Sequence, residues 1–257
     1  MNMDFSGKRV LVTGSTMGIG RATAEMFHAA GAVVAINGRN AATVAKAARD
    51  IGQARLVEAP GDIRTEAGCK AVVGMAIGAM GGIDCLVNNV GIRPLARLMD
   101  VTEAHWDEVI SVNLQSAMFC TTAALPALRV SKGNVVMVSS IAGLMAGPTD
   151  RFVYSVAAAG LVGMTRTLAL ELAGDRIRVN CLCPGFVDTP MVRAENTATN
   201  GQVDRWVETV MPLGRLSTPR ECASSILYLA SEDAAYCTGS TLVNDGGCAA
   251  NACWGSK

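Results

Sequence analysis

The sequence is poor in lysine, histidine and aromatic residues, and neither sign of charge is in excess. It holds five lysines and two histidines, and Lys+Arg and Asp+Glu both number 22. Nucleic-acid binding needs a basic surface that neutralises phosphates, so the balanced charge argues against nucleic acid as a partner. With only His28 and His105, and no CxxC pair among nine cysteines, we expect no metal site.

Long hydrophobic runs are also absent. No segment reaches the roughly 18 to 20 consecutive apolar residues that a bilayer-spanning helix needs, and residues 1–7 carry Asp4 and lack the apolar stretch of a signal peptide. We therefore expect no membrane partner and a cytoplasmic protein with reduced cysteines. No Pro/Ser-rich run, charge block or low-complexity tract divides the chain, which predicts a single domain over residues 1–257.

The chain does show a regular alternation of short apolar runs and longer segments of helical character. Seven runs are plausible strands, at 9–13, 32–36, 55–59, 83–88, 134–139, 178–182 and 240–244. Several of them are near-continuous valine, isoleucine and leucine, which is typical of strands buried on both faces. Helices are predicted between them at 19–30, 41–51, 65–80, 103–125, 153–172 and 219–230. The alternation predicts an α/β, Rossmann-type doubly wound fold, with a seven-stranded, mainly parallel sheet and helices on both faces.

A glycine-rich turn follows the first predicted strand and opens the first predicted helix. It reads Gly14-Ser15-Thr16-Met17-Gly18-Ile19-Gly20. Glycines let the backbone turn sharply and approach a pyrophosphate without interference from a Cβ atom, and the helix N-terminus offers free N–H groups to phosphate. The strand–turn–helix context therefore predicts a dinucleotide site. The alternative is a turn with a structural role only.

The end of the second predicted strand bears on the choice of cofactor. An acidic residue there would bind the ribose hydroxyls of NAD(H) and repel a 2′-phosphate, but the sequence is Asn37-Gly38-Arg39-Asn40. The guanidinium of Arg39 suits a phosphate, so NADP(H) is favoured and NAD(H) is the alternative. Met17 weakens this preference, because a basic side chain there would have helped hold the phosphate. A solvated surface arginine is the other interpretation of Arg39.

Together with later motifs, these features resemble the short-chain dehydrogenase/reductase family over essentially the whole chain. The further motifs are Asp62-Ile63, Asn88-Asn89-Val90-Gly91, Asn113, Ser139-Ser140, Tyr154, Pro184-Gly185-x-Val187-x-Thr189 and Asp245-Gly246-Gly247. Within the family, the sequence is similar to gluconate 5-dehydrogenase and 3-oxoacyl-carrier-protein reductase types. The resemblance implies an NAD(P)-dependent oxidoreductase that interconverts a ketone and a secondary alcohol by hydride transfer, as a homotetramer or homodimer.

The resemblance also implies roles for single residues. Tyr154 would be the general acid/base, Ser140 would bind the carbonyl oxygen with Ser139 as the alternative, and Asn113 would help hold a water in the proton relay. The cofactor would contact the glycine turn and the end of the second strand. Its further contacts would be Asp62, Ile63, Asn89, Val90, Gly91, Tyr154, Pro184, Gly185, Val187 and Thr189.

One position departs from the family pattern. A tyrosine with an ordinary pKa of about 10 needs a nearby cation to act as a base at neutral pH, and the family supplies a lysine four residues later, one helical turn away. Here that residue is Ala158. We favour an engineered Lys→Ala variant of a working enzyme. The alternatives are a natural regulator or scaffold that keeps the cofactor site, and an active enzyme in which Arg151 replaces the lysine.

Arginines are frequent in the loops expected to form the substrate pocket, at 93–98, 144–152 and 193–213. Arginine recognises anionic groups, so we expect a small-molecule carbonyl or alcohol substrate that is polar or anionic. The alternative is that most of these arginines are solvated surface charges. The candidate substrate contacts are Arg93, Ser140, Arg151, Tyr154 and Trp206.

Overall fold

A computed structural model of the protein describes residues 3–145 and 150–251, so part of the expected substrate segment 144–152 lies outside the described residues. One sheet takes seven strands in the order β3-β2-β1-β4-β5-β6-β7, and each neighbouring pair is parallel. The predicted doubly wound α/β fold is thereby confirmed. The strands are β1 (Arg9–Val12), β2 (Val33–Gly38), β3 (Leu56–Pro60), β4 (Cys85–Asn88), β5 (Asn134–Val138), β6 (Arg178–Pro184) and β7 (Thr241–Asn244).

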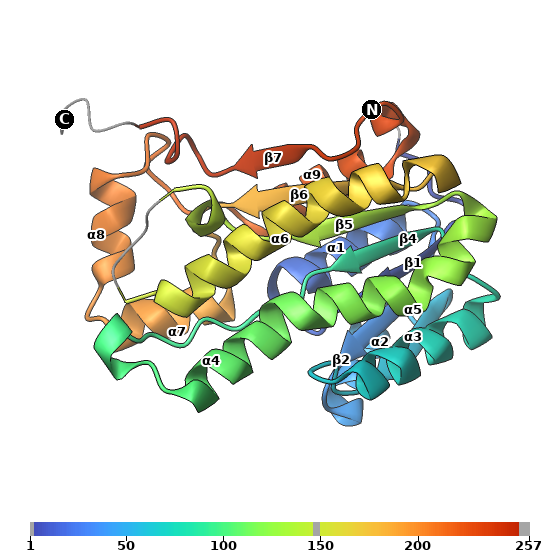
Figure 1. The fold of residues 1–257 in the computed structure, drawn as a ribbon, viewed down its shortest axis with the longest axis horizontal. Helices are drawn as coiled ribbons and strands as arrows, with labels where there is room; N and C mark the ends of the chain where they lie inside the picture. Colours follow the sequence, from blue (N-terminus) through green and yellow to red (C-terminus); the bar gives the residue numbers. More distant parts are fainter. Residues whose placement is uncertain (1–2, 146–149, 252–257) are drawn as a thin grey trace.

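Helices cover both faces of the sheet (Figure 1). On one face, α3, α5 and α6 pack around buried residues such as Leu11 and Met137. On the other face, α1, α2 and α9 pack around Phe27 and Ile226. Strands between two apolar layers need apolar side chains on both sides, which explains their continuous hydrophobic runs. The bounds are α1 (Gly18–Ala29), α2 (Ala41–Ile51), α3 (Glu66–Met80), α5 (Ser116–Ser131), α6 (Phe152–Glu171) and α9 (Pro219–Ala230).

The segment predicted as one helix, 103–125, is two helices joined by a π-helical turn. α4 spans Glu103–Ile110, the π turn spans Ser111–Gln115, and α5 follows without a break. The predicted helix ends directly before Pro126, a residue that lacks an N–H and clashes with the preceding turn of a helix. The helix nevertheless continues through Pro126, since Leu128 beyond it is fully buried and tertiary packing of an apolar face outweighs one lost hydrogen bond.

The expected substrate segment 193–213 was predicted as a loop, which is wrong, because most of it is helical. It holds most of α7 (Pro190–Ala198) and all of α8 (Gln202–Thr209). Thr189 caps α7 by accepting a hydrogen bond from the N–H of Val192 at 3.3 Å, and Pro190 occupies the first helical turn. The Thr-Pro start signal was therefore present in the sequence. α8 is eight residues long and buries only Val203, so it offers little periodicity to detect.

One helix in the described parts of the chain, α6, is long and apolar enough to cross a membrane by length and composition. In the fold it lies on the sheet, and Leu161 and Val162 belong to the buried core. The core helix of a soluble protein passes the same test, so α6 is weak evidence for a membrane span.

Candidate active site

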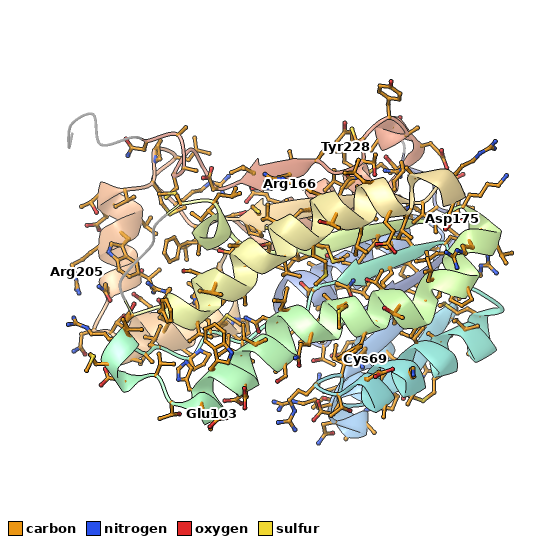
Figure 2. All side chains as sticks on the ribbon, viewed as in Figure 1. Cys69, Glu103, Arg166, Asp175, Arg205 and Tyr228 are labelled. Atoms are coloured by element: carbon orange, nitrogen blue, oxygen red, sulfur yellow. The ribbon has the colours of Figure 1, made fainter. Side chains whose placement is uncertain are left out.

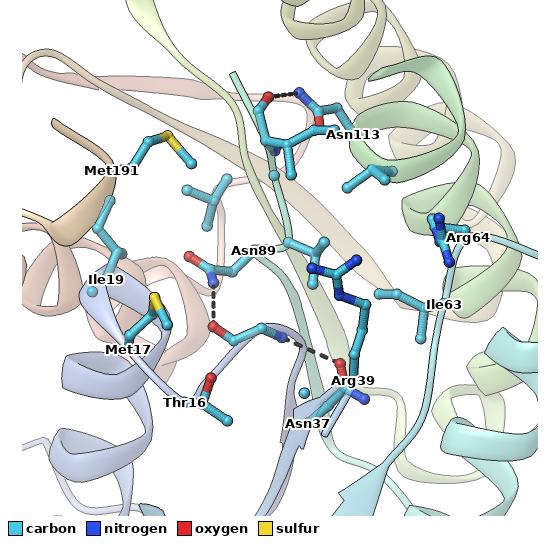
Figure 3. Close-up of a pocket in the computed structure, with 18 of the residues that line it drawn as sticks. Thr16, Met17, Ile19, Asn37, Arg39, Ile63, Arg64, Asn89, Asn113 and Met191 are labelled. Atoms are coloured by element: carbon cyan, nitrogen blue, oxygen red, sulfur yellow. Dashed lines mark hydrogen bonds between the residues drawn. The ribbon is translucent and has the colours of Figure 1, made fainter. Parts of the chain in front are cut away.

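Most of the predicted motif residues gather at the carboxyl ends of the strands, next to the point where the strand order reverses. The chain leaves β1 in one direction to form β2 and β3, and returns to the other side of β1 with β4. Open α/β sheets bind ligands in the crevice at such a switch point. A cavity of about 380 Å³ opens there (Figure 3), and we call it the cofactor cavity.

Most of the predicted cofactor contacts line the cofactor cavity. They are Gly14, Thr16, Met17, Gly18, Ile19, Asn37, Arg39, Asp62, Ile63, Asn89, Val90, Gly91, Tyr154 and Thr189. The other five, Ser15, Gly20, Pro184, Gly185 and Val187, are not among its lining residues. Ser15 and Val187 are buried, and the Ser15 hydroxyl accepts a hydrogen bond from the N–H of Asn37 at 2.9 Å.

The glycine turn is packed too tightly for side chains at two of its positions. A Cβ atom on Gly20 would lie 2.4 Å from the carbonyl oxygen of Gly14, and a Cβ on Gly14 would lie 2.8 Å from a methyl group of Val90. Gly14 also has a φ of +61°, a conformation that favours glycine. The backbone therefore forms the cavity wall directly, as close approach to a pyrophosphate requires.

Two asparagines fasten this turn to the neighbouring strands. Asn37 accepts a hydrogen bond from the N–H of Gly14 at 3.3 Å and donates to the carbonyl oxygen of Ala59 at 2.9 Å. Asn89 donates to the carbonyl oxygens of Thr13 and Gly14 at 3.0 and 3.2 Å (Figure 3). Through these bonds to the backbone, both side chains fix the position of the glycine turn that borders the cavity.

We expect Gly20→Ala to weaken NADPH binding by about tenfold or more, because the new methyl group forces the turn to shift. Gly74→Ala is the matched control. Gly74 is exposed in α3 with nothing within 4 Å of an added Cβ, so this change should leave binding unaltered and stabilise the fold by about 0.5–1 kcal/mol. NADPH fluorescence titrations and thermal unfolding measure both effects. Unchanged affinity in Gly20→Ala would argue against cofactor binding at this turn.

Two arginines border the end of the cofactor cavity beside β2 and β3 (Figure 3). The guanidinium of Arg64 bonds to Asp62 and holds the pKa of that carboxyl below its ordinary value against the opposing effect of burial, with a smaller contribution from the charge of Arg39. Arg39 itself belongs to none of the ion pairs within residues 3–145 and 150–251. Arg64 was not predicted, although it directly follows the Asp62-Ile63 motif.

The two serines at the end of β5 lie at different cavities. Ser139 lines the cofactor cavity, and its Oγ donates to the carbonyl oxygen of Ala158 at 2.9 Å. Ser140 lines a second cavity of about 170 Å³, which we call the substrate cavity, and its Oγ accepts from the N–H of Ala142 at 3.1 Å. Tyr154 lines both cavities. Its side chain therefore lies at their junction.

Asn113 lies within the π turn and fixes the loop after β4. Its Oδ1 accepts from the N–H of Ile92 at 2.9 Å, and its Nδ2 donates to the carbonyl oxygen of Ile92 at 2.8 Å (Figure 3). These two bonds position the backbone at the edge of the cofactor cavity, which Ile92 also lines. The water contact expected of Asn113 stays a prediction.

Ala158 follows Tyr154 by one turn of α6 and also lines the cofactor cavity. Its backbone is closely packed, since a Cβ atom on Gly143 would lie 2.6 Å from the carbonyl carbon of Ala158. Because the side chain borders the cavity, a longer one at this position could extend into that space beside Tyr154.

All five predicted substrate contacts line the substrate cavity: Arg93, Ser140, Arg151, Tyr154 and Trp206. The side chains of Arg93 and Arg151 are buried, and each pairs with Glu195 of α7. Arg205, by contrast, projects from the outer side of α8 (Figure 2). Glu195 was missed, because no local signal in Arg-Ala-Glu-Asn distinguishes a buried carboxylate from an exposed one.

The chain is similar to known proteins over nearly its whole length. A family model described as enoyl-(acyl carrier protein) reductase matches residues 14–249. A 3-oxoacyl-[acyl-carrier-protein] reductase from Thermotoga maritima is 37% identical over 257 residues, covering 95% of this chain and 99% of that protein. The (2S)-[(R)-hydroxy(phenyl)methyl]succinyl-CoA dehydrogenase subunit BbsD from Thauera aromatica is 36% identical over 248 residues, covering 95% of this chain and 98% of that protein.

Solved structures agree with the sequence relatives. The crystal structure of a short-chain dehydrogenase/reductase SDR:glucose/ribitol dehydrogenase from Brucella melitensis superposes with a TM-score of 0.90 at 32% identity, covering 96% of this chain and 99% of that chain. Sequence and fold similarity both extend through the glycine turn and the Tyr154 helix. The chain therefore belongs to the short-chain dehydrogenase/reductase family.

Proposed function

We propose that the chain is an NADP(H)-dependent oxidoreductase that interconverts a ketone and a secondary alcohol on a small-molecule substrate. Family membership supports the oxidoreductase class and an NAD(P) cofactor. One similar protein is named a 3-oxoacyl reductase and another a dehydrogenase of a hydroxy compound, which favours the ketone–alcohol couple. The observation that carries the proposal is the position of Tyr154, which borders both the cavity at the glycine turn and the cavity that holds Ser140.

The side chains around Tyr154 suit proton transfer to a carbonyl oxygen. The nicotinamide, when bound, supplies or accepts the hydride. The Tyr154 hydroxyl would give a proton to the developing alkoxide during reduction, and the Tyr154 phenolate would accept the proton of the alcohol during oxidation. Ser140 can donate a hydrogen bond to the same oxygen, because its Oγ accepts from Ala142 and no acceptor within the described residues takes its proton. Ser139 is less suited, since its proton is bonded to the carbonyl of Ala158.

The preference for NADP(H) rests on the charge at the cavity end beside β2. An acidic residue in that place would repel a 2′-phosphate, whereas Arg39 lines this end and Arg64 lies next to it. Arg64 already forms an ion pair with Asp62. Arg39 is therefore the stronger candidate to bind the 2′-phosphate of the cofactor. NAD(H) is the alternative cofactor.

Arg39→Ala should weaken NADPH binding by about 10- to 100-fold, because a charge-assisted hydrogen bond to the phosphate is lost. NADH, which lacks that phosphate, should lose far less. Arg49→Ala, an exposed arginine of α2 away from the cavity, is the matched control and should change neither affinity. Calorimetric titration with both cofactors measures the difference. Equal losses for the two cofactors would remove the basis for preferring NADP(H).

Ala158 leaves the cofactor side of Tyr154 without the cation that the family pattern supplies, and we propose that turnover of this chain is impaired for that reason. Arg151, the predicted replacement, packs on Trp206 with 4.8 Å between its guanidinium carbon and the ring centre, and pairs with Glu195. An engineered Lys→Ala change remains our favoured interpretation. The second candidate function is a dinucleotide-binding regulator or scaffold. An intact glycine turn, combined with Ala158 in place of the lysine, is also what such a protein would have.

The remaining expectations stay predictions: a single domain over residues 1–257, a cytoplasmic location, no nucleic-acid or membrane partner, and a homotetramer or homodimer. Met118 on α5 and Leu170 on α6 are exposed apolar side chains. Contact with a second copy of the chain would bury such side chains, and this supports the predicted oligomer.

A further inference from the structure

A buried ion-pair cluster forms the polar side of the substrate cavity. Arg93 comes from the loop after β4, Arg151 lies at the start of α6, and Glu195 lies on α7; their side chains are 9%, 3% and 5% exposed. Glu195 pairs with both arginines, through Oε2 to Arg93 and Oε1 to Arg151. A backbone hydrogen bond of 2.8 Å from Ala96 to Asp150 brings the two arginine-bearing loops together.

The cluster carries more positive charge than its buried carboxylate balances. Two guanidiniums lie against one buried carboxylate, and the other acid in contact, Asp150, is 28% exposed and 3.4 Å from Nη1 of Arg151. Burial lowers the pKa of Arg151 to about 10, and repulsion by Arg93 contributes. Buried charge is costly unless it is paired and hydrogen-bonded. The Nε–H groups of both arginines are buried and have no acceptor within the described residues, which adds to the cost of the excess positive charge. One more anion beside the guanidiniums would offset that charge.

This cluster borders the same cavity as the proposed catalytic groups. Arg93, Arg151, Ser140 and Tyr154 all line it, and the guanidinium carbon of Arg93 lies 5.7 Å from the centre of the Tyr154 ring. An anion held by the arginines would therefore lie a few bonds from a carbonyl group at Tyr154. The cavity has a volume of about 170 Å³, which suits a small molecule.

We propose that the Arg93–Glu195–Arg151 cluster binds a carboxylate of the substrate, so that the chain acts on small oxo acids and hydroxy acids with a free carboxylate near the reacting carbon. This inference rests on the proposed function and names its substrate class. A planar guanidinium matches the two oxygens of a carboxylate. The bound acid brings the buried charges to two guanidiniums and two carboxylates. The apolar remainder of such a substrate would face Phe186 and Trp206.

Matched acid and amide probes test the proposal on the chain as it is. We would titrate 4-oxopentanoate and 4-oxopentanamide, and 3-oxobutanoate and 3-oxobutanamide, into the protein saturated with NADP⁺. Because the cofactor is oxidised, these ketones cannot be reduced, and calorimetry reports binding alone. We expect at least one acid to bind about tenfold or more tightly than its amide. Equal affinities within both pairs would overturn the proposal.

Variants that remove one charged side chain from the cluster distinguish carboxylate recognition from a purely structural ion pair. Arg93→Met leaves a neutral Arg151–Glu195 pair, and we expect it to abolish the acid preference while amide binding is retained. Glu195→Gln leaves both cations, and the acid preference should persist or increase. Arg193→Met removes an exposed arginine of the same helix, paired with Asp188, and should change nothing. Thermal unfolding and NADP⁺ binding verify folding. If Arg93→Met keeps the acid preference, or lowers acid and amide binding equally, the carboxylate proposal is wrong. The cluster would then have only a structural role in holding α7.

The inference and the proposed function fail in different ways. Preferential acid binding without hydride transfer to any ketone, even in the Ala158→Lys form, would refute the oxidoreductase proposal and leave the carboxylate site standing. Reduction of neutral ketones in that form, with no acid preference in binding, would refute the carboxylate site and support the oxidoreductase proposal.

Discussion

Ala158→Lys is expected to raise turnover by about two to four orders of magnitude, the range that a well-positioned acid–base group contributes. Residue 158 lines the cofactor cavity one turn after Tyr154, so a lysine there would bring an ammonium group beside the phenol. A neighbouring cation favours the phenolate, which is the form that accepts the proton during alcohol oxidation. NADP(H) affinity should change much less, because Arg39 and the glycine turn are untouched.

The measurement is the rate of NADPH oxidation with a panel of ketones, and of NADP⁺ reduction with secondary alcohols. Ala159→Lys is the matched control, since it adds the same charge at the adjacent, exposed position of α6, and it should leave turnover at the parent level. Activity that stays flat in Ala158→Lys, with folding and cofactor binding intact, would count against the engineered-variant interpretation. It would favour the regulator or scaffold instead.

Tyr154→Phe, made in the Ala158→Lys form, is expected to lower turnover by about 100- to 10,000-fold. The change deletes the proton-transferring hydroxyl and keeps the ring, so the contact with the guanidinium of Arg93 is retained. NADPH affinity should remain close to that of the parent. The readout is kcat for the best ketone of the panel, together with an NADPH titration.

The control for this change is Tyr228→Phe. Tyr228 lies on α9 (Figure 2) and lines neither cavity, and its hydroxyl is 3.9 Å from the sulfur of Cys237. Removing that hydroxyl should leave turnover unaltered. A Tyr154→Phe enzyme as active as its parent would rule out Tyr154 as the acid/base and direct attention to Ser140 or a bound water.

The sheet could be predicted because its determinants are local. Val135, Val136 and Met137 are all fully buried. A short, continuous apolar run between a glycine and two serines is typical of a strand that lies between two layers of helices. The glycine turn could likewise be located, since Gly14 and Gly20 are required by backbone packing within one turn.

The polar side of the substrate cavity could not be predicted in the same way. Glu195 is buried because its partner Arg93 comes from a loop 102 residues earlier, and that pairing exists only after the chain has folded. The arginines could be suspected from their frequency, but the sequence does not show which of them are buried. The π turn was also missed, because its Asn113 is held by the backbone of Ile92, a contact invisible to helical periodicity.

That π turn also makes the length of the chain between α4 and α5 matter. A π turn accommodates one residue more than the α-helix around it, which is equivalent to a single-residue insertion. Deleting Leu114 would restore an uninterrupted α-helix and leave α4 and α5 close to their present faces, but the residues of the turn itself would change direction. Asn113 would then lose its alignment with Ile92. The segment should tolerate substitutions at its exposed positions far better than the loss of one residue, although it lies in neither a loop nor a glycine motif.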